Sequence, residues 1–241
     1  MVRNDRAKKA TIVTQLTNDQ LSKILANALG EKPRSPSATM AVIEQILQPS
    51  QGELFFAGVA VIVEGIEDVA YRATYFQLTN RLSDFRRCGC HFVVTNGKGP
   101  LSRPLAIAKG LSIPSFTIFD ADTNDAEHKK THELNNKCIL TLCGVDKPDP
   151  WPKETYWGEE VVMWSESLDR AVMQAVGQPL WDDMDVQVRK DLNLEGVTRK
   201  NGVLIAAVME GLHEKKPKID ILERLADTLM KFASRHLPKE E

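Results

Sequence analysis

The sequence lacks the features of membrane-spanning, secreted and strongly basic proteins. No apolar run in its 241 residues approaches the roughly 20 residues that span a bilayer. The N-terminal stretch has no hydrophobic segment of the kind found in signal peptides. The formal net charge is −2, which excludes a nucleic-acid coat protein held by overall charge. We therefore expect a cytoplasmic protein with no membrane partner, in which a local basic patch contacts any phosphates.

Cysteine is scarce and its spacing does not suit zinc. The four cysteines are Cys88, Cys90, Cys138 and Cys143, whereas zinc sites typically use C-x-x-C pairs. Without a secretory signal, we expect free thiols. His128 and His132 have the i, i+4 spacing that can hold a metal, but they lie in a very polar run. We interpret them as a solvated helix face.

The pattern from residue 59 onward predicts an α/β protein with a parallel sheet flanked by helices. Strands are expected at 59–63, 91–94, 115–119 and 160–164. A helix over 67–81 has Ala70, Ala73, Phe76 and Leu82 as its candidate core. The pattern after residue 167 predicts only helices. The last of them, over 217–236, carries an apolar stripe of Ile219, Leu222, Leu225, Leu229 and Phe232.

The segment before residue 58 predicts an N-terminal junction and two helices. Ala10–Leu16 resembles an isolated strand, and Thr17 and Gly30 suit the start and end of a first helix. A second helix follows a loop over 31–37 and carries Met40, Ile43, Ile46 and Leu47. Residues 53–57 predict a short turn that packs its phenylalanines beneath the first strand. We expect three regions: 1–57, a catalytic domain over 58–166, and a helical region over 167–241 that packs on it.

Two of the predicted strands end in carboxylates. Glu64 follows strand 59–63, Asp120 and Asp122 end strand 115–119, and Asp68 falls in the first turn of the next helix. The carboxyl ends of parallel strands meet at one edge of the sheet. Each acid alone could be a helix cap or a surface residue, but crowded carboxylates repel unless a cation neutralises them. Mg²⁺ prefers oxygen ligands, and two such ions can clamp a phosphodiester.

Two basic elements could contact phosphate. Gly97, Lys98 and Gly99 lie after the middle strand, where glycines let backbone N–H groups approach an anion. Lys215, Lys216 and Lys218 precede the last helix, where a lysine could stabilise charge on a scissile phosphate or stand exposed to water. No G-x-x-x-x-G-K-[ST] motif occurs, so no ATP site is expected in this chain.

Over residues 50–125 these motifs resemble the Toprim (topoisomerase–primase) catalytic domain. They combine Glu64 and Asp68, the glycine–lysine–glycine turn, and the Asp120-Ala-Asp122 pair. The lead-in at 53–57 and the turn Leu111–Pro114 are similar to the nuclease region of the overcoming-lysogenization-defect (OLD) family of ATP-dependent endonucleases.

This resemblance implies a DNA endonuclease or nickase that uses two Mg²⁺ (or Mn²⁺) ions. It implies metal ligation by Glu64, Asp68, Asp120 and Asp122. The family has further metal-binding acids after the next strand. Glu166 and Asp169 match these best, and Glu160 is a weaker match. It implies a catalytic lysine, best matched by Lys216. Full-length members carry an ABC-type ATPase domain, so the chain is expected to be the nuclease half of a longer protein, and homo-oligomerisation is left open.

Two other functions compete with this interpretation. Asp120-Ala-Asp122-Thr123 also matches the D-x-D-x-T signature of haloacid-dehalogenase-type phosphatases, with Asp120 as nucleophile and Asp122 as general acid/base. That family begins with the motif on its first strand, whereas here a strand–helix–strand–helix unit precedes it. The third hypothesis is a Toprim-like module that binds DNA without cutting it.

Overall fold

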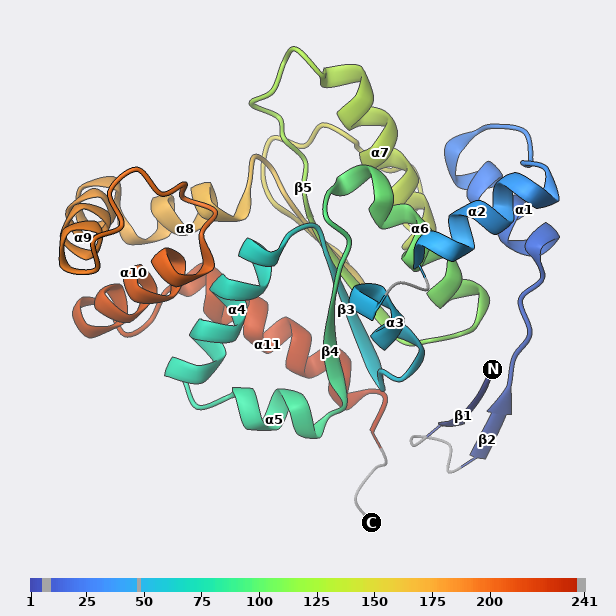
Figure 1. Ribbon diagram of the computed structural model, residues 1–241, viewed down its shortest axis with the longest axis horizontal. Helices are drawn as coiled ribbons and strands as arrows, with labels where there is room; N and C mark the ends of the chain where they lie inside the picture. Colours follow the sequence, from blue (N-terminus) through green and yellow to red (C-terminus); the bar gives the residue numbers. More distant parts are fainter. Residues whose placement is uncertain (6–9, 47–48, 238–241) are drawn as a thin grey trace.

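A five-stranded sheet forms the centre of the computed structural model, which describes residues 1–5, 10–46 and 49–237 (Figure 1). The strand order is β4-β3-β5-β7-β6. Four strands run parallel, and β6 pairs antiparallel with β7 at the edge. The predicted α/β class is confirmed. The strand bounds are β3 Val59–Val63, β4 Cys90–Val94, β5 Ser115–Asp120, β6 Tyr156–Trp157 and β7 Val161–Trp164.

Strand β3 is buried on both faces, which explains its unbroken apolar sequence. Val59, Val61 and Val63 point into one hydrophobic cluster, and Ala60 and Ile62 point into the other. Because side chains alternate along a strand, one short segment joins both halves of the core.

Helices cover both faces of the sheet (Figure 1). The cluster on the first face includes residues of six helices: α4 Ile66–Leu78, α5 Leu82–Arg87, α8 Leu168–Val176, α9 Gln178–Asp191, α10 Gly202–Lys215 and α11 Asp220–Ser234. The cluster on the second face includes residues of four helices: α1 Asn18–Leu29, α2 Pro36–Ile46, α6 Lys98–Gly110 and α7 Lys129–Leu142. None of the helices that the structure describes is both long enough and apolar enough to cross a bilayer.

The predicted core of the last helix is confirmed, and that of the 67–81 helix is confirmed in part, since Phe76 is buried and Ala70 and Leu82 pack against the same cluster. Leu222, Leu225, Leu229 and Phe232 are all buried in α11. In α4, Phe76 is buried as predicted, but Ala70 and Ala73 are only half-buried. Leu82 belongs to the separate helix α5.

The buried face of α4 also carries polar side chains. Tyr71, Arg72 and Tyr75 lie there beside Phe76. Tyr75 tolerates burial because its hydroxyl donates a hydrogen bond to Oε1 of Glu223 in α11, at 2.6 Å.

The N-terminal segment differs from prediction in two ways. The strand β2 (Ala10–Val13) is not isolated, because it pairs antiparallel with β1 (Val2–Asp5), which precedes it in the chain. Helix α2 begins at Pro36, inside the expected loop, and its buried residues are Thr39, Val42 and Ile46. Met40 is exposed because α2 packs against α1 and α6 through the helix face that carries Thr39, Val42 and Ile46. Leu47 lies outside the described residues.

Other elements around α1 agree with prediction. Thr17 forms a capping box with Gln20 at the start of α1, and Gly30 ends the helix in the left-handed conformation, with φ 69°. All four cysteines are free thiols, as expected.

The turn before β3 buries a leucine rather than both phenylalanines. It consists of the short helix α3 (Pro49–Gly52) and the 3₁₀ turn η1 (Glu53–Phe55). Leu54 is fully buried, Phe55 is half-buried, and Phe56 is 88% exposed. The tight turn directs Leu54 into the core and Phe56 into solvent, so the expected packing of both phenylalanines is wrong.

The contrast between these neighbours gives a stability test. Leu54→Ala should lower the free energy of unfolding by about 2–5 kcal/mol, because it leaves a cavity in the core. Phe56→Ala, the matched control, should change it by less than about 0.5 kcal/mol. Urea unfolding followed by circular dichroism measures both, and a larger loss for Phe56→Ala would contradict this description of the turn.

Candidate functional site

The carboxyl ends of β3, β5 and β7 bring acidic side chains to one edge of the sheet. Glu64 follows β3, Asp120 ends β5, and Asp169 lies in the first turn of α8, after β7. Oε1 of Glu64 accepts a hydrogen bond from the backbone N–H of Asp120, at 2.9 Å. The neighbouring strand therefore fixes the Glu64 carboxylate.

Asp68 is held by its own helix. Its Oδ2 accepts a hydrogen bond from the N–H of Gly65 at 3.0 Å, and its Oδ1 lies 3.3 Å from Nη1 of Arg72, one turn later. Only 6% of Asp68 is exposed. A carboxylate in the first turn also interacts favourably with the helix dipole.

The Asp120–Asp122 pair is positioned by the chain after β7. Oδ1 of Asp120 accepts a hydrogen bond from the N–H of Leu168, at 3.2 Å, so the start of α8 faces this carboxylate. The N–H of Asp122 donates to the carbonyl of Glu166 at 3.1 Å. Asp122 has φ 55°, a left-handed conformation that aspartate adopts more readily than most residues.

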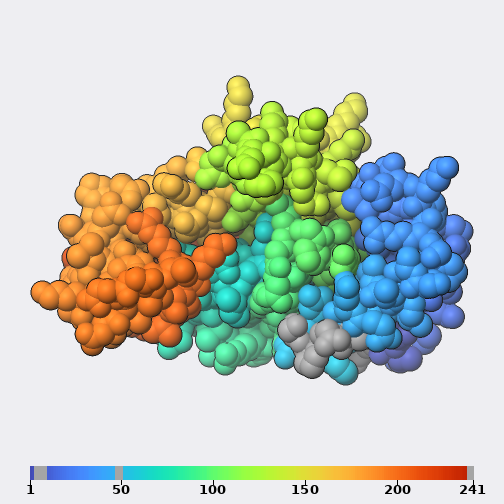
Figure 2. All heavy atoms as spheres, turned by 45° about the horizontal axis from the view of Figure 1, so that its top comes forward, coloured from blue at the N-terminus to red at the C-terminus, as the bar shows by residue number. Residues whose placement is uncertain are grey.

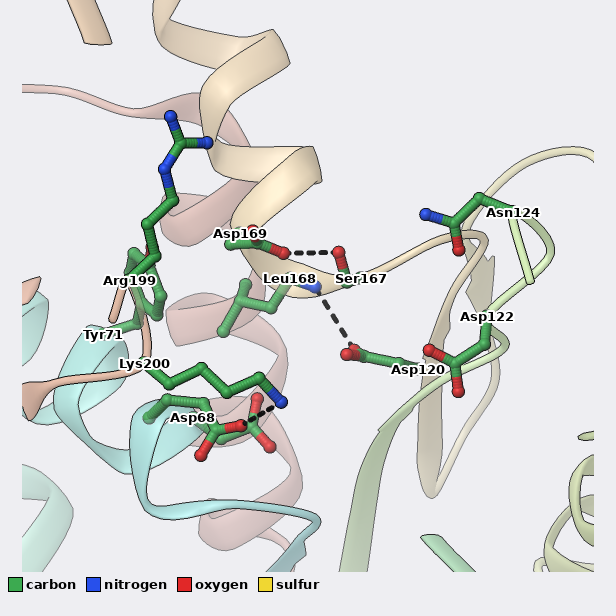
Figure 3. A pocket seen from close by; sticks show the side chains of 11 residues that line it. Asp68, Tyr71, Asp120, Asp122, Asn124, Ser167, Leu168, Asp169, Arg199 and Lys200 are labelled. Atoms are coloured by element: carbon green, nitrogen blue, oxygen red, sulfur yellow. Dashed lines mark hydrogen bonds and ion pairs between the residues drawn. The ribbon is translucent and has the colours of Figure 1, made fainter. Parts of the chain in front are cut away.

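Asp68, Asp120, Asp122 and Asp169 border a pocket of about 210 Å³ (Figure 3). Glu64 does not line this pocket, and it reaches the group through its hydrogen bond to the N–H of Asp120. In Figure 3, Asp120 and Asp122 lie on one side, while Arg199 and Lys200 approach from the other. The pocket lies where α4, β5, α8 and the segment before α10 meet. Its lining residues are Glu67, Asp68, Tyr71, Asp120, Asp122, Asn124, Ser167, Leu168, Asp169, Arg199 and Lys200.

Burial and crowding raise the pKa values of the central acids. Desolvation raises the pKa of Glu64 to about 7, although Lys98 opposes the shift. The pKa of Asp120 is raised by burial and then by the charges of Asp68, Glu64 and Asp122. Burial also raises the pKa of Asp68, opposed by Arg72. Burial is the largest cause of all three shifts, and the neighbouring carboxylates add to it at each acid.

Two buried cations compensate part of that charge. Nζ of Lys98 donates to the carbonyl of Asp120 at 2.6 Å and lies 2.5 Å from Oδ2 of Asp122. Arg72 is 1% exposed, and its three guanidinium nitrogens form no aligned hydrogen bond, although Nη1 is ion-paired with Asp68. These contacts show that a positive charge fits among the carboxylates. Because the acidic donors are all oxygens, the group suits a hard divalent cation.

The three residues predicted to contact phosphate, Gly97, Lys98 and Gly99, make contacts within the protein instead. Gly97 has φ 124°, a conformation that favours glycine, and its N–H donates to the carbonyl of Glu64. Lys98 and Gly99 already belong to the first turn of α6. The ammonium of Lys98 faces the carboxylates, and none of these three residues lines the pocket.

Among the other predicted residues, the structure brings Asp169 to the pocket, where Ser167 donates a hydrogen bond to it. Glu166 lies next to this segment, but its side chain does not line the pocket. Lys216 is also outside the lining, and its Nζ donates to the carbonyl of Ala175, at the end of α8, at 2.5 Å.

Sequence reasoning missed the two cations at the mouth of the pocket. Arg199 and Lys200 precede Asn201, whose side chain caps α10, and Nζ of Lys200 lies 3.1 Å from Oε1 of Glu67. In Figure 2 the segment near residue 200 (orange) lies beside the atoms of α4 (cyan). A basic pair next to a helix cap was the signal available, but spacing alone does not relate it to a carboxylate about 130 residues earlier.

The solved structures to which the chain is similar include C-terminal regions of two bacterial OLD proteins. The C-terminal region of the Burkholderia pseudomallei OLD protein is 20% identical, with 77% of this chain and 93% of that chain covered and a TM-score of 0.43. The C-terminal region of the Xanthomonas campestris pv. campestris OLD protein, phased with iodine, is 18% identical, with 78% and 87% covered and a TM-score of 0.40. No curated protein matches the chain.

The family assignment rests on a match to residues 55–122. This segment runs from the turn before β3 to Asp122 and contains Glu64, Asp68 and Asp120. The matching family is described as overcoming lysogenization defect protein-like, TOPRIM domain. The chain therefore carries, at residues 55–122, a Toprim domain of the overcoming-lysogenization-defect-protein-like family.

Proposed function

We propose that this chain is a metal-dependent DNA endonuclease or nickase that hydrolyses phosphodiester bonds with two Mg²⁺ or Mn²⁺ ions. The observation that carries the proposal is the gathering of Asp68, Asp120, Asp122 and Asp169 around one pocket, with Glu64 hydrogen-bonded to the backbone of Asp120 beside it. The Toprim family match supports the same class of protein.

The donors present fit the proposed ions. Glu64, Asp68, Asp120 and Asp122 would hold them, with Asp169 and Glu166 contributing from the segment after β7. When bound, such ions activate the attacking water and stabilise the charge that develops on the phosphate. The proposed roles of these six residues are those that the sequence resemblance implies.

The protein's own residues would orient the DNA backbone. Arg199 and Lys200 line the pocket opposite Asp120 and Asp122 (Figure 3), where a phosphate between them would meet positive charge. The Lys200 side chain is 80% exposed, so it can reach a phosphate by leaving Glu67. Lys98 is a candidate to contact phosphate only if it leaves Asp122.

The partners that we propose are DNA and an ABC-type ATPase domain in a longer protein of which this chain is the nuclease part. The near-neutral charge of −2 favours few, local phosphate contacts, with others from the ATPase part or a second copy of the chain. The phosphatase alternative uses Asp120 as a nucleophile. Its carboxylate instead accepts a hydrogen bond from Leu168 and is crowded by Asp68 and Glu64, which disfavours that role.

Plasmid nicking tests the proposed activity directly. Wild-type protein with Mg²⁺ or Mn²⁺ should convert supercoiled plasmid to the open-circular form. Asp120→Asn keeps an acceptor for the Leu168 N–H but removes a charge, and should slow nicking more than about 100-fold. Asp19→Asn, in an exposed ion pair, is the control and should nick normally.

Three outcomes would contradict this prediction. Nicking by Asp120→Asn at the wild-type rate would indicate another site or a contaminant. Absence of nicking together with hydrolysis of a small phosphate monoester would favour the phosphatase, and absence of both would favour the non-catalytic module.

The raised pKa values predict how the metal-free protein responds to pH. With a pKa of about 7 against its ordinary 4.5, folded Glu64 keeps a proton that the unfolded chain releases between those values. The free energy of unfolding should therefore fall as pH rises through this window, by about 3 kcal/mol for Glu64 alone. Asp120 and Asp68 shift in the same direction.

Urea unfolding in EDTA from pH 5 to pH 7 measures this slope. Glu64→Gln should flatten it, whereas the exposed control Asp19→Asn, whose partner Lys23 stays charged over this range, should leave it unchanged. Added Mg²⁺ should stabilise the wild type more at pH 7 than at pH 5, because it replaces the protons. A stability that rises with pH in EDTA would refute the proposed crowding of charge.

Two lysines are expected to affect different steps. Lys200→Ala should weaken DNA binding and reduce the slope of log affinity against log salt by about 0.9, the loss of one phosphate contact. Lys216→Ala should lower the nicking rate at saturating DNA with little change in affinity, if Lys216 leaves Ala175 to reach the reacting phosphate. Fluorescence anisotropy and nicking assays separate these effects, with Lys23→Ala as an exposed control. Unchanged affinity in Lys200→Ala would remove it from the DNA contact.

A further inference from the structure

Three side chains that the proposed nuclease reaction does not use gather just after the Asp120–Asp122 pair. They are Asp125, His128 and His132, and one ligand atom of each lies within 4.8 Å of the other two. The two histidines lie one turn apart at the start of α7, and Asp125 lies in the preceding turn. The i, i+4 spacing thus directs both rings towards the same carboxylate.

One oxygen of Asp125 faces both rings. Oδ2 lies 3.0 Å from Nδ1 of His128 and 3.2 Å from Nε2 of His132. Oδ1 accepts a hydrogen bond from the N–H of His128 at 3.1 Å, which fixes the carboxylate. Two ligands about 2.1 Å from a tetrahedral ion are about 3.4 Å apart, so the observed separations need little change to accept one.

The other nitrogen of the His132 ring faces the proposed catalytic site. Nδ1 lies 3.3 Å from Oδ2 of Asp122 and is buried without an aligned hydrogen bond. Only 17% of the His132 side chain is exposed. In protein metal sites a histidine that binds through one nitrogen commonly donates its other N–H to a carboxylate, which orients the ring. Asp122 is in position for that second role.

We propose that Asp125, His128 and His132 form a binding site for a transition-metal ion of the Zn²⁺ class, separate from the oxygen-ligand site. Imidazole nitrogens select Zn²⁺, Co²⁺ or Ni²⁺, whereas Mg²⁺ prefers oxygen. Three protein ligands leave the fourth position to water. Because His132 also contacts Asp122, an ion at this site would lie next to the Asp120–Asp122 pair. The proposal does not require these carboxylates to act in the nuclease reaction. The alternative is that the two histidines bind no metal and belong to a solvated helix face, as the sequence analysis interprets them.

The test measures Zn²⁺ binding in excess Mg²⁺, which occupies oxygen sites. Isothermal titration calorimetry should give one bound Zn²⁺ per chain that depends on the histidines. In protein labelled with ¹⁵N-histidine, the ring signals of two of the five histidines should shift on adding Zn²⁺ but not Mg²⁺. This readout distinguishes the proposed site from binding by the free thiols, because those leave the histidine rings unchanged.

The variants are the double substitution His128→Ala/His132→Ala and, as a milder change, Asp125→Asn. The double variant should lose at least about 100-fold in Zn²⁺ affinity. His91→Ala, a half-exposed histidine elsewhere, should retain wild-type affinity. Circular dichroism without Zn²⁺ checks folding, and Asp125→Asn supplies the test if the double variant is unfolded. Undetectable Zn²⁺ binding, equal binding by the double variant, or Zn²⁺ binding without shifts of the histidine signals would overturn the proposal.

Discussion

The organising constraint of this protein is electrostatic: parallel strands that end in carboxylates bring like charges together at one edge of the sheet. Glu64, Asp120 and Asp122 cannot separate, because β3 and β5 are hydrogen-bonded neighbours. Asp68 adds a further charge from the helix that follows β3. The buried Arg72, Lys98 and the start of α8 oppose this repulsion.

The two halves of the hydrophobic core keep that arrangement rigid. Strand β3 places alternate residues in each cluster, so moving its carboxyl end would disturb packing on both faces. Helices α10 and α11 pack on α4, which carries Asp68 and Arg72. Helices α10 and α11 therefore hold α4 in place, and the segment before α10 supplies Arg199 and Lys200 to the pocket.

Local sequence signals predicted the parts of the site that depend on neighbouring residues. The apolar runs at 59–63 and 115–119, each followed by acids, predicted both the strands and the convergence of Glu64 with Asp120. Arg72 and Lys200 were missed because their importance arises from contacts between distant segments or from burial that periodicity does not reveal. Phe56 and Met40 show the converse: apolar residues at suitable spacing were exposed because competing neighbours occupied the core.

The position of Lys98 bears on how folding and the proposed metal binding are related. Its ammonium already occupies a place between the Asp120 carbonyl and the Asp122 carboxylate, with only 6% of the side chain exposed. The chain therefore carries an internal counter-ion for the Asp122 carboxylate. If the proposed metal ions bind, their loading is separable from folding, and an ion at Asp122 would exchange with the tethered ammonium of Lys98.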